Sequence, residues 1–77
     1  MTPDLELDCR ELLCPMPIIE LAKHVADVPV GGVIGVVAHD VAARVDVPAW
    51  CRLRSQEYVG EDTADDGAPR YLVRRLR

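Results

Sequence analysis

The sequence has no phenylalanine and few aromatic side chains of any kind. Its 77 residues include one tryptophan and two tyrosines, so Val, Leu, Ile and Ala must fill the interior. A chain of this length forms one domain, which we expect to span residues 1–77, and it buries about 60–65% of its unfolded surface. We do not expect a deep cavity for a large organic cofactor in so small a core.

The sequence also shows no long apolar run, no signal-peptide pattern and no excess of basic charge. No stretch approaches the ~20 apolar residues that span a membrane, and no basic segment precedes an apolar one as in a signal peptide. The formal net charge is −4, which disfavours binding to nucleic acid through the whole surface. We therefore expect a cytoplasmic protein without a membrane or a nucleic acid as a direct partner.

The cysteines and histidines do not follow a metal-site pattern. Cys9 and Cys14 are separated by four residues, and the sequence has no Cys-x2-Cys or His-x3–5-His pair. Three cysteines are an odd number without the density of a disulfide scaffold, which agrees with a reducing compartment. We expect neither a bound metal nor an organic cofactor.

The charges near the carboxyl end of the chain are divided by sign. The acidic residues are Glu61, Asp62, Asp65 and Asp66, and the basic ones are Arg70, Arg74, Arg75 and Arg77. Solvated charge on a hairpin and an edge strand is the interpretation we prefer, because such charge protects a sheet edge. A partner-docking patch is the alternative.

The most informative segment is Cys14-Pro15-Met16-Pro17. Pro15 suits the first position of a helix, where a missing N–H costs little, and Cys14 is then the expected N-cap. Its thiol would lie at the positive end of the helix dipole, with the N–H groups of Met16 and Ile18 as donors. This environment lowers a thiol pKa, here by roughly one unit, and favours the reactive thiolate. The alternative is an inert, buried cysteine that happens to precede a helix.

Hydrophobic periodicity predicts four strands and two helices in the order βαβαββ. Strands are expected at 5–9, 33–38, 57–61 and 70–76. One helix follows Cys14 and stops before Pro29; the second lies within 42–54, with an irregular turn at 41–45 and Asp46 as its N-cap. Both helices can cover one face of a four-stranded mixed sheet, which gives a two-layer α/β sandwich.

Three further residues are candidates for chemistry near Cys14. Cys9 could act as a resolving thiol by forming a disulfide with Cys14, although a small core residue on a strand is the interpretation we prefer. Cys51 falls on the apolar side of the second helix and is interpreted as core. His39 follows an apolar strand, where ligands and catalytic groups gather, and its imidazolium would favour the Cys14 thiolate if the two were close. A loop histidine without such a role is the alternative.

A set of short segments is distributed along nearly the whole chain, at about 7–74: Leu7-Asp8, Leu12, Cys14-Pro15-Met16-Pro17, Asp40, Asp46-Val47-Pro48-Ala49-Trp50-Cys51 and Tyr71-Leu72-Val73-Arg74. With these segments at this spacing, the sequence resembles the TusA/SirA-like sulfur carriers. The resemblance implies the same βαβαββ fold. It also implies a sulfurtransferase activity in which Cys14 carries a persulfide, with Pro15, Met16, Pro17 and Asp40 as supporting residues.

The resemblance implies two protein partners as well. The donor would be a cysteine desulfurase or a rhodanese-like protein, and the acceptor a further protein. In the best-known members the sulfur reaches the tRNA wobble uridine, and other members serve other sulfur pathways. The alternatives to a sulfur carrier are a module in which Cys9 and Cys14 switch between dithiol and disulfide, and a plain interaction domain.

Overall fold

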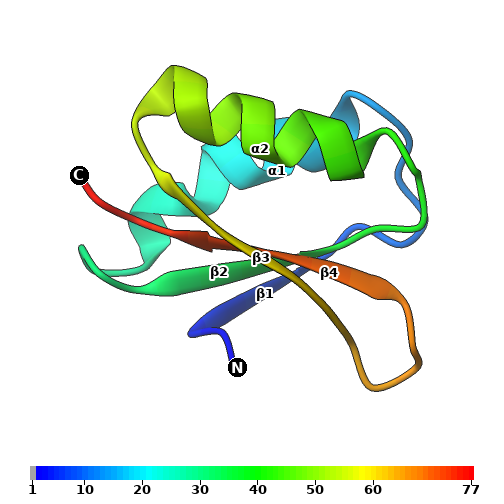
Figure 1. The fold of residues 1–77 in the computed structure, drawn as a ribbon. Coiled ribbons are helices and arrows are strands. Elements are labelled where there is room, and N and C mark those ends of the chain that lie inside the picture. Colours follow the sequence, from blue (N-terminus) through cyan, green and yellow to red (C-terminus); the bar gives the residue numbers. More distant parts are fainter. Residues whose placement is uncertain (1) are drawn as a thin grey trace.

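The computed structural model describes residues 2–77, and its regular elements follow the order β1-α1-β2-α2-β3-β4. The strands are β1 (Leu5–Asp8), β2 (Val33–Val37), β3 (Glu57–Thr63) and β4 (Pro69–Arg74). The helices are α1 (Met16–His24), which continues into the short 3-10 helix η1 (Val25–Asp27), and α2 (Ala43–Arg54). Within residues 2–77 the sheet has four strands in the order β1-β2-β4-β3. Figure 1 shows both helices on one face of this sheet, so the predicted two-layer sandwich is confirmed.

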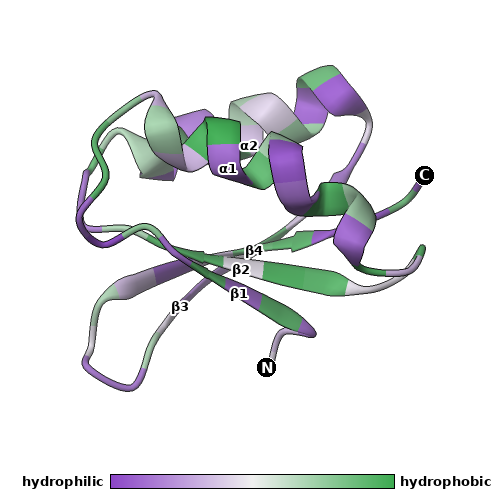
Figure 2. Cartoon of the chain, turned by 180° about the vertical axis from the view of Figure 1, so that it is seen from behind, coloured by the Kyte–Doolittle hydropathy of each residue, from purple (hydrophilic) through white to green (hydrophobic). Residues whose placement is uncertain are grey.

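Strand β2 lies inside the sheet, as its continuous apolar run predicts. It pairs in parallel with β1 and antiparallel with β4, and all five of its residues are buried. Ile34 and Val36 lie opposite Val73 and Tyr71 of β4, and these four residues belong to the main core beneath the helices. In Figure 2 the hydrophobic colour runs through most of β2. A strand buried on both faces needs apolar residues at consecutive positions, because successive side chains point to opposite faces of the sheet.

Two of the basic residues near the carboxyl end pair with carboxylates on neighbouring strands. Arg70 contacts both Asp62 of β3, at 2.8 Å, and Glu6 of β1, at 3.0 Å. Arg74 contacts Glu57 at 3.0 Å. These ion pairs lie within the sheet, which agrees with the interpretation as strand and hairpin charge.

Each helix buries one stripe of side chains against the sheet. Pro17 and Leu21 are the buried residues of α1. The buried residues of α2 are Ala43, Val47, Trp50 and Cys51. This spacing of three and four residues is the apolar face of an amphipathic helix. No helix within residues 2–77 is long and apolar enough to cross a membrane.

The start of α2 differs from the prediction. The helix is continuous from Ala43, contains Pro48, and has Asp46 in its first turn instead of at its N-cap. The N-cap is Ala42, and no side chain caps the helix. The prediction that Asp46 is the N-cap is therefore wrong: the first N–H groups of α2 donate to the backbone carbonyls of Asp40, Val41 and Ala42, so no carboxylate is needed for them. These bonds form a tight turn that runs directly into the helix instead of a separate turn before it.

Candidate functional site

Cys14 lies where two loops meet at one end of the sheet. The β1–α1 loop carries Cys14 and runs beside the β2–α2 loop, which carries Asp40 (Figure 1). Because β1 and β2 are parallel, both loops leave the carboxyl ends of their strands. Functional groups in α/β sheets gather at this position. Among the described residues Cys14 is the exposed cysteine, whereas Cys9 and Cys51 are buried.

The Asp40 carboxylate joins the two loops. Its Oδ2 accepts the Cys14 backbone N–H at 2.7 Å, and its Oδ1 accepts the Ala42 N–H at 3.0 Å. These two hydrogen bonds favour the ionised carboxylate and lower the pKa of Asp40 below its usual value. One side chain thus fixes the backbone of the cysteine relative to the start of α2.

The backbone N–H groups expected to hold a Cys14 thiolate have other partners. The Met16 N–H donates to the Leu13 carbonyl at 2.8 Å, and the Ile18 N–H donates to the Pro15 carbonyl at 3.1 Å. The N-cap of α1 is Pro15, so the prediction that Cys14 caps this helix is wrong. The physical reason is that two tight turns satisfy these donors with carbonyl groups before a side chain is needed.

The Cys14 thiol instead donates a hydrogen bond to Asp46. The distance from Sγ to Oδ2 is 3.2 Å, and Asp46 is half-buried in the first turn of α2. This hydrogen bond is the main reason why the pKa of Cys14 is raised; desolvation and the charges of Asp46 and Asp40 act in the same direction. The prediction that the pKa of Cys14 is lowered therefore has the wrong sign. The Asp46 carboxylate contacts the sulfur at the place where backbone N–H donors were expected.

An apolar cavity of about 370 Å³ opens beside Cys14 between the two helices. Its other lining residues are Pro15 and Ile18 from the α1 side and Asp46, Ala49, Trp50 and Leu53 from α2. Leu53 is 80% exposed, and Leu13, next to Cys14, is 72% exposed. The thiol therefore lies at the edge of an exposed apolar surface, a feature that often marks an interaction site.

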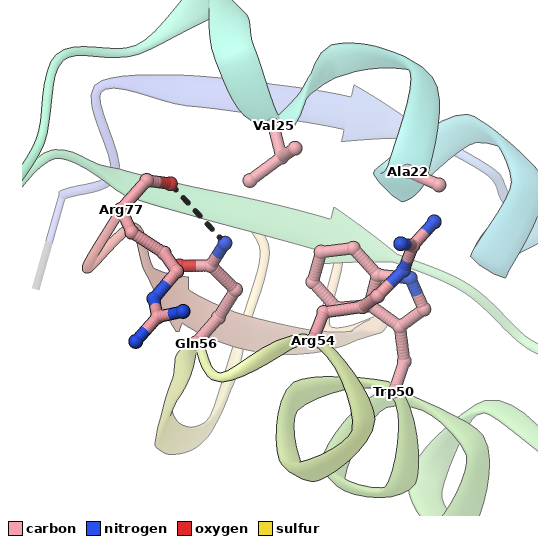
Figure 3. A pocket seen from close by; sticks show the side chains of 6 residues that line it. All are labelled: Ala22, Val25, Trp50, Arg54, Gln56 and Arg77. Atoms are coloured by element: carbon pink, nitrogen blue, oxygen red, sulfur yellow. Dashed lines mark hydrogen bonds between the residues drawn. The ribbon is translucent and has the colours of Figure 1, made fainter.

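A second cavity lies farther along the same pair of helices (Figure 3). It has a volume of about 350 Å³ and is lined by Ala22, Val25, Trp50, Arg54, Gln56 and Arg77. The Gln56 side-chain amide donates to the Arg77 carbonyl at 3.4 Å, as the dashed line in Figure 3 shows. Trp50 lines both cavities. Its indole is thus part of the packing beneath the surface that carries Cys14.

Cys9 and Cys51 occupy core positions. Each is 1% exposed, and burial raises the pKa of each thiol to about 11. Both belong to the main hydrophobic core, as the preferred interpretation of each predicts. Within the described chain Cys9 lines a different cavity from the one beside Cys14. A disulfide between Cys9 and Cys14 would first require Cys9 to leave the core.

His39 does not contact the thiol. It is exposed and directly precedes Asp40, and across residues 2–77 no hydrogen bond or ion pair joins it to Cys14. Its role as a modulator of the thiolate remains a prediction. The same residues contain no group of three or more His, Cys, Asp or Glu side chains placed to hold a metal ion.

Burial predicts a clear order of thiol reactivity. Iodoacetamide should alkylate Cys14 in the native protein well before Cys9 and Cys51, because only an accessible thiolate reacts. The measurement is mass spectrometry of the three cysteine peptides after short labelling times, with a urea-unfolded sample as the control in which all three react. Native labelling of Cys51 as fast as that of Cys14 would contradict the burial described here.

The fold and the site define a class of protein. It is a small two-layer α/β domain that presents a cysteine, followed by Pro-x-Pro, at the carboxyl ends of two parallel strands. Residues 5–75 match the family described as Sulfurtransferase TusA. The chain therefore belongs to the TusA family of sulfur carriers, and the resemblance seen in the sequence is confirmed.

Relatives in two Pseudomonas species support this assignment. The chain is 39% identical over 75 residues to the sulfur carrier protein TusA of Pseudomonas syringae pv. syringae (strain B728a), covering 97% of this chain and 88% of the relative. It is 35% identical over 74 residues to TusA of Pseudomonas putida (strain GB-1), covering 96% and 91%. The solved structure of a SirA-like protein from Desulfitobacterium hafniense superposes with a TM-score of 0.78 at 19% identity, covering 95% of this chain and 99% of that one, which shows a shared fold.

Asp46 is the site residue whose role the sequence did not reveal. Its place in the family marker 46–51 is visible in the sequence, but the local pattern offers a helix cap as a sufficient explanation. Its contact with Cys14 spans 32 positions of the chain. Only the packing of α2 beside the β1–α1 loop brings the two side chains together.

Proposed function

We propose that Cys14 is the residue on which this protein carries sulfur. It accepts a sulfane sulfur as a persulfide from a donor protein, such as a cysteine desulfurase or a rhodanese-like protein, and passes it to an acceptor protein. The observation that carries the proposal is the contrast among the cysteines: Cys14 is exposed beside an apolar cavity, while Cys9 and Cys51 are buried in the core. A carrier needs a thiol that the catalytic cysteine of another protein can reach.

The transfer itself is a thiol exchange. The Cys14 thiolate attacks the outer sulfur of the donor persulfide, a new bond forms from Sγ to that sulfur, and the donor S–S bond breaks. The donor cysteine leaves with the electron pair of that bond and takes up a proton equivalent to the one Cys14 has lost. No net oxidation occurs, so the step requires no added oxidant or reductant. Delivery to the acceptor repeats the same exchange with Cys14 as the leaving group.

The residues around Cys14 give it a defined position for this exchange. Asp40 holds its backbone N–H at 2.7 Å, and Pro17, the second proline of the motif, is fully buried as an anchor for α1. Pro15 lines the cavity and Met16 is exposed next to it. We assign these four residues the supporting role that the motif suggests: they hold the thiol at a fixed place on an apolar docking surface.

The test is the intact mass of the protein after incubation with a cysteine desulfurase and L-cysteine. We expect a gain of one sulfur atom, about 32 Da, mapped to Cys14 and removed by a reducing agent. A loss of about 2 Da that links Cys9 to Cys14 would instead support the dithiol switch. Absence of both changes with an active desulfurase would count against the carrier role with this class of donor.

A further inference from the structure

We propose that Asp46 restrains the empty carrier: by accepting the thiol hydrogen of Cys14 it keeps the unloaded cysteine protonated and weakly nucleophilic until a sulfur donor docks. The inference rests on the proposed function of Cys14 and adds the control of its reactivity. The geometry that supports it is the 3.2 Å contact from Sγ to Asp46 Oδ2. A carboxylate in this position stabilises the thiol over the thiolate, since only the thiol can donate to it.

The charges around the sulfur also favour the protonated thiol of Cys14. Asp46 is the charged residue among those that line the cavity beside Cys14, and Asp40 contacts the Cys14 backbone from the β2–α2 loop. Together with the hydrogen bond, these two carboxylates raise the pKa of Cys14. Four basic groups on the surrounding elements have carboxylate partners: Arg10 binds Asp8 and Asp66, Arg44 binds Glu61, and Lys23 and His24 contact Glu20. The other two arginines of α2, Arg52 and Arg54, lie in its last turn, at the opposite end of the helix from Asp46.

The restraint is specific to the unloaded state. Once Cys14 carries a sulfane sulfur, Sγ is bonded to Cβ and to that sulfur and has no hydrogen left to donate. The hydrogen bond that links the β1–α1 loop to the first turn of α2 is therefore lost on loading. A persulfide anion would also be repelled by the Asp46 carboxylate. Both effects favour an outer sulfur directed away from α2, where an acceptor can take it.

Such a restraint has a use in a carrier with an exposed cysteine. Alkylation and oxidation both proceed through the thiolate, so holding the free thiol in its protonated form slows both reactions. The restraint therefore lowers the reactivity of the unloaded Cys14 toward small electrophiles and oxidants.

The test compares the pH profile of Cys14 alkylation in the wild type and in Asp46→Asn. The rate follows the thiolate fraction, so the midpoint of the profile reports the pKa of Cys14. Asparagine keeps the size and an acceptor oxygen but removes the charge. We expect a midpoint at lower pH and alkylation at neutral pH several-fold faster than in the wild type. Asp65→Asn, which makes the same charge change at an exposed residue of the β3–β4 loop, is the matched control and should leave the profile in place.

Two outcomes would overturn the proposal. One is an Asp46→Asn profile with the wild-type midpoint, even if the melting temperature falls, because a purely structural role changes stability without changing titration. The other outcome concerns the wild-type protein and applies even if Asp46→Asn does not fold. The midpoint of the pH profile for Cys14 alkylation should lie at higher pH in the native protein than in the urea-unfolded protein. A native midpoint equal to or below the unfolded one overturns the proposal. Neither readout uses a sulfur donor, so a failure here is distinct from a failure of sulfur loading.

Discussion

Replacing Cys14 by serine should abolish sulfur loading completely, whereas replacing Cys9 by alanine should leave it at the wild-type level. A serine hydroxyl does not ionise at neutral pH and cannot hold a sulfane sulfur. The substitution lies at an exposed position, so the fold should be unaffected. Alanine is chosen for Cys9 because this residue is 1% exposed, and a buried serine hydroxyl would require a hydrogen-bond partner. The measurement is the mass gain on incubation with a cysteine desulfurase and L-cysteine.

The matched control for this pair is Cys51→Ala, which removes the other buried thiol. Far-UV circular dichroism and thermal unfolding should show that all three variants are folded before loading is compared. If folded Cys9→Ala loses loading while Cys51→Ala keeps it, Cys9 takes part in the chemistry and the dithiol switch is favoured. If Cys14→Ser still gains a sulfur atom, the assignment of the carrier residue fails.

The fold could be predicted because its signals are local and repeat along the chain. Alternation over residues 5–9 indicated a strand, and the apolar run over 33–38 indicated an inner strand. By spacing, Val47, Trp50, Cys51 and Arg54 share one side of α2, with Leu53 near it. The first three residues are in the core, whereas Arg54 and Leu53 are exposed. With the element order fixed in this way, few arrangements of two helices and four strands remain.

The electrostatics of the site could not be predicted in the same way. A helix N-terminus after Cys14 suggested a lowered thiol pKa, because local rules count only the N–H groups and the dipole of that helix. The partners that decide the sign are Asp40 and Asp46, which lie 26 and 32 positions away in the sequence. Their contact with Cys14 depends on how the β2–α2 loop and α2 pack against the β1–α1 loop. Periodicity places a helix on a sheet, but it does not say which side chain meets a given atom.

The same limit explains the error at the start of α2. Asp40 and Asp46 are both plausible caps by residue type, and Pro48 near the second one suggested a later start. In the structure neither carboxylate caps α2. Asp40 accepts the Ala42 and Cys14 N–H groups, and Asp46 accepts the Cys14 thiol. Both contacts with Cys14 depend on tertiary packing, which residue type alone does not reveal.

Replacing Trp50 by alanine should remove a large part of the folding stability. Trp50 is 7% exposed, belongs to the main core and lines both cavities between the helices. Truncation of a buried aromatic side chain of this size costs about 3–5 kcal/mol, and a domain of 77 residues has a total stability of about 4–12 kcal/mol. The midpoint of urea unfolding, followed by circular dichroism because the variant lacks tryptophan, should therefore fall by about a quarter or more.

Leu53→Ala is the matched control for this loss. Leu53 lies on the same helix and lines the cavity beside Cys14, but it is 80% exposed, so its truncation should cost no more than about 0.5 kcal/mol. Trp50→Phe should retain most of the stability because it keeps an aromatic ring in the core. In Trp50→Ala, iodoacetamide should also reach Cys51, since faster opening exposes a thiol one position away on the helix. A Trp50→Ala midpoint equal to that of Leu53→Ala would show that the indole does not hold the two helices on the sheet, and the packing that places Asp46 against Cys14 would need another source.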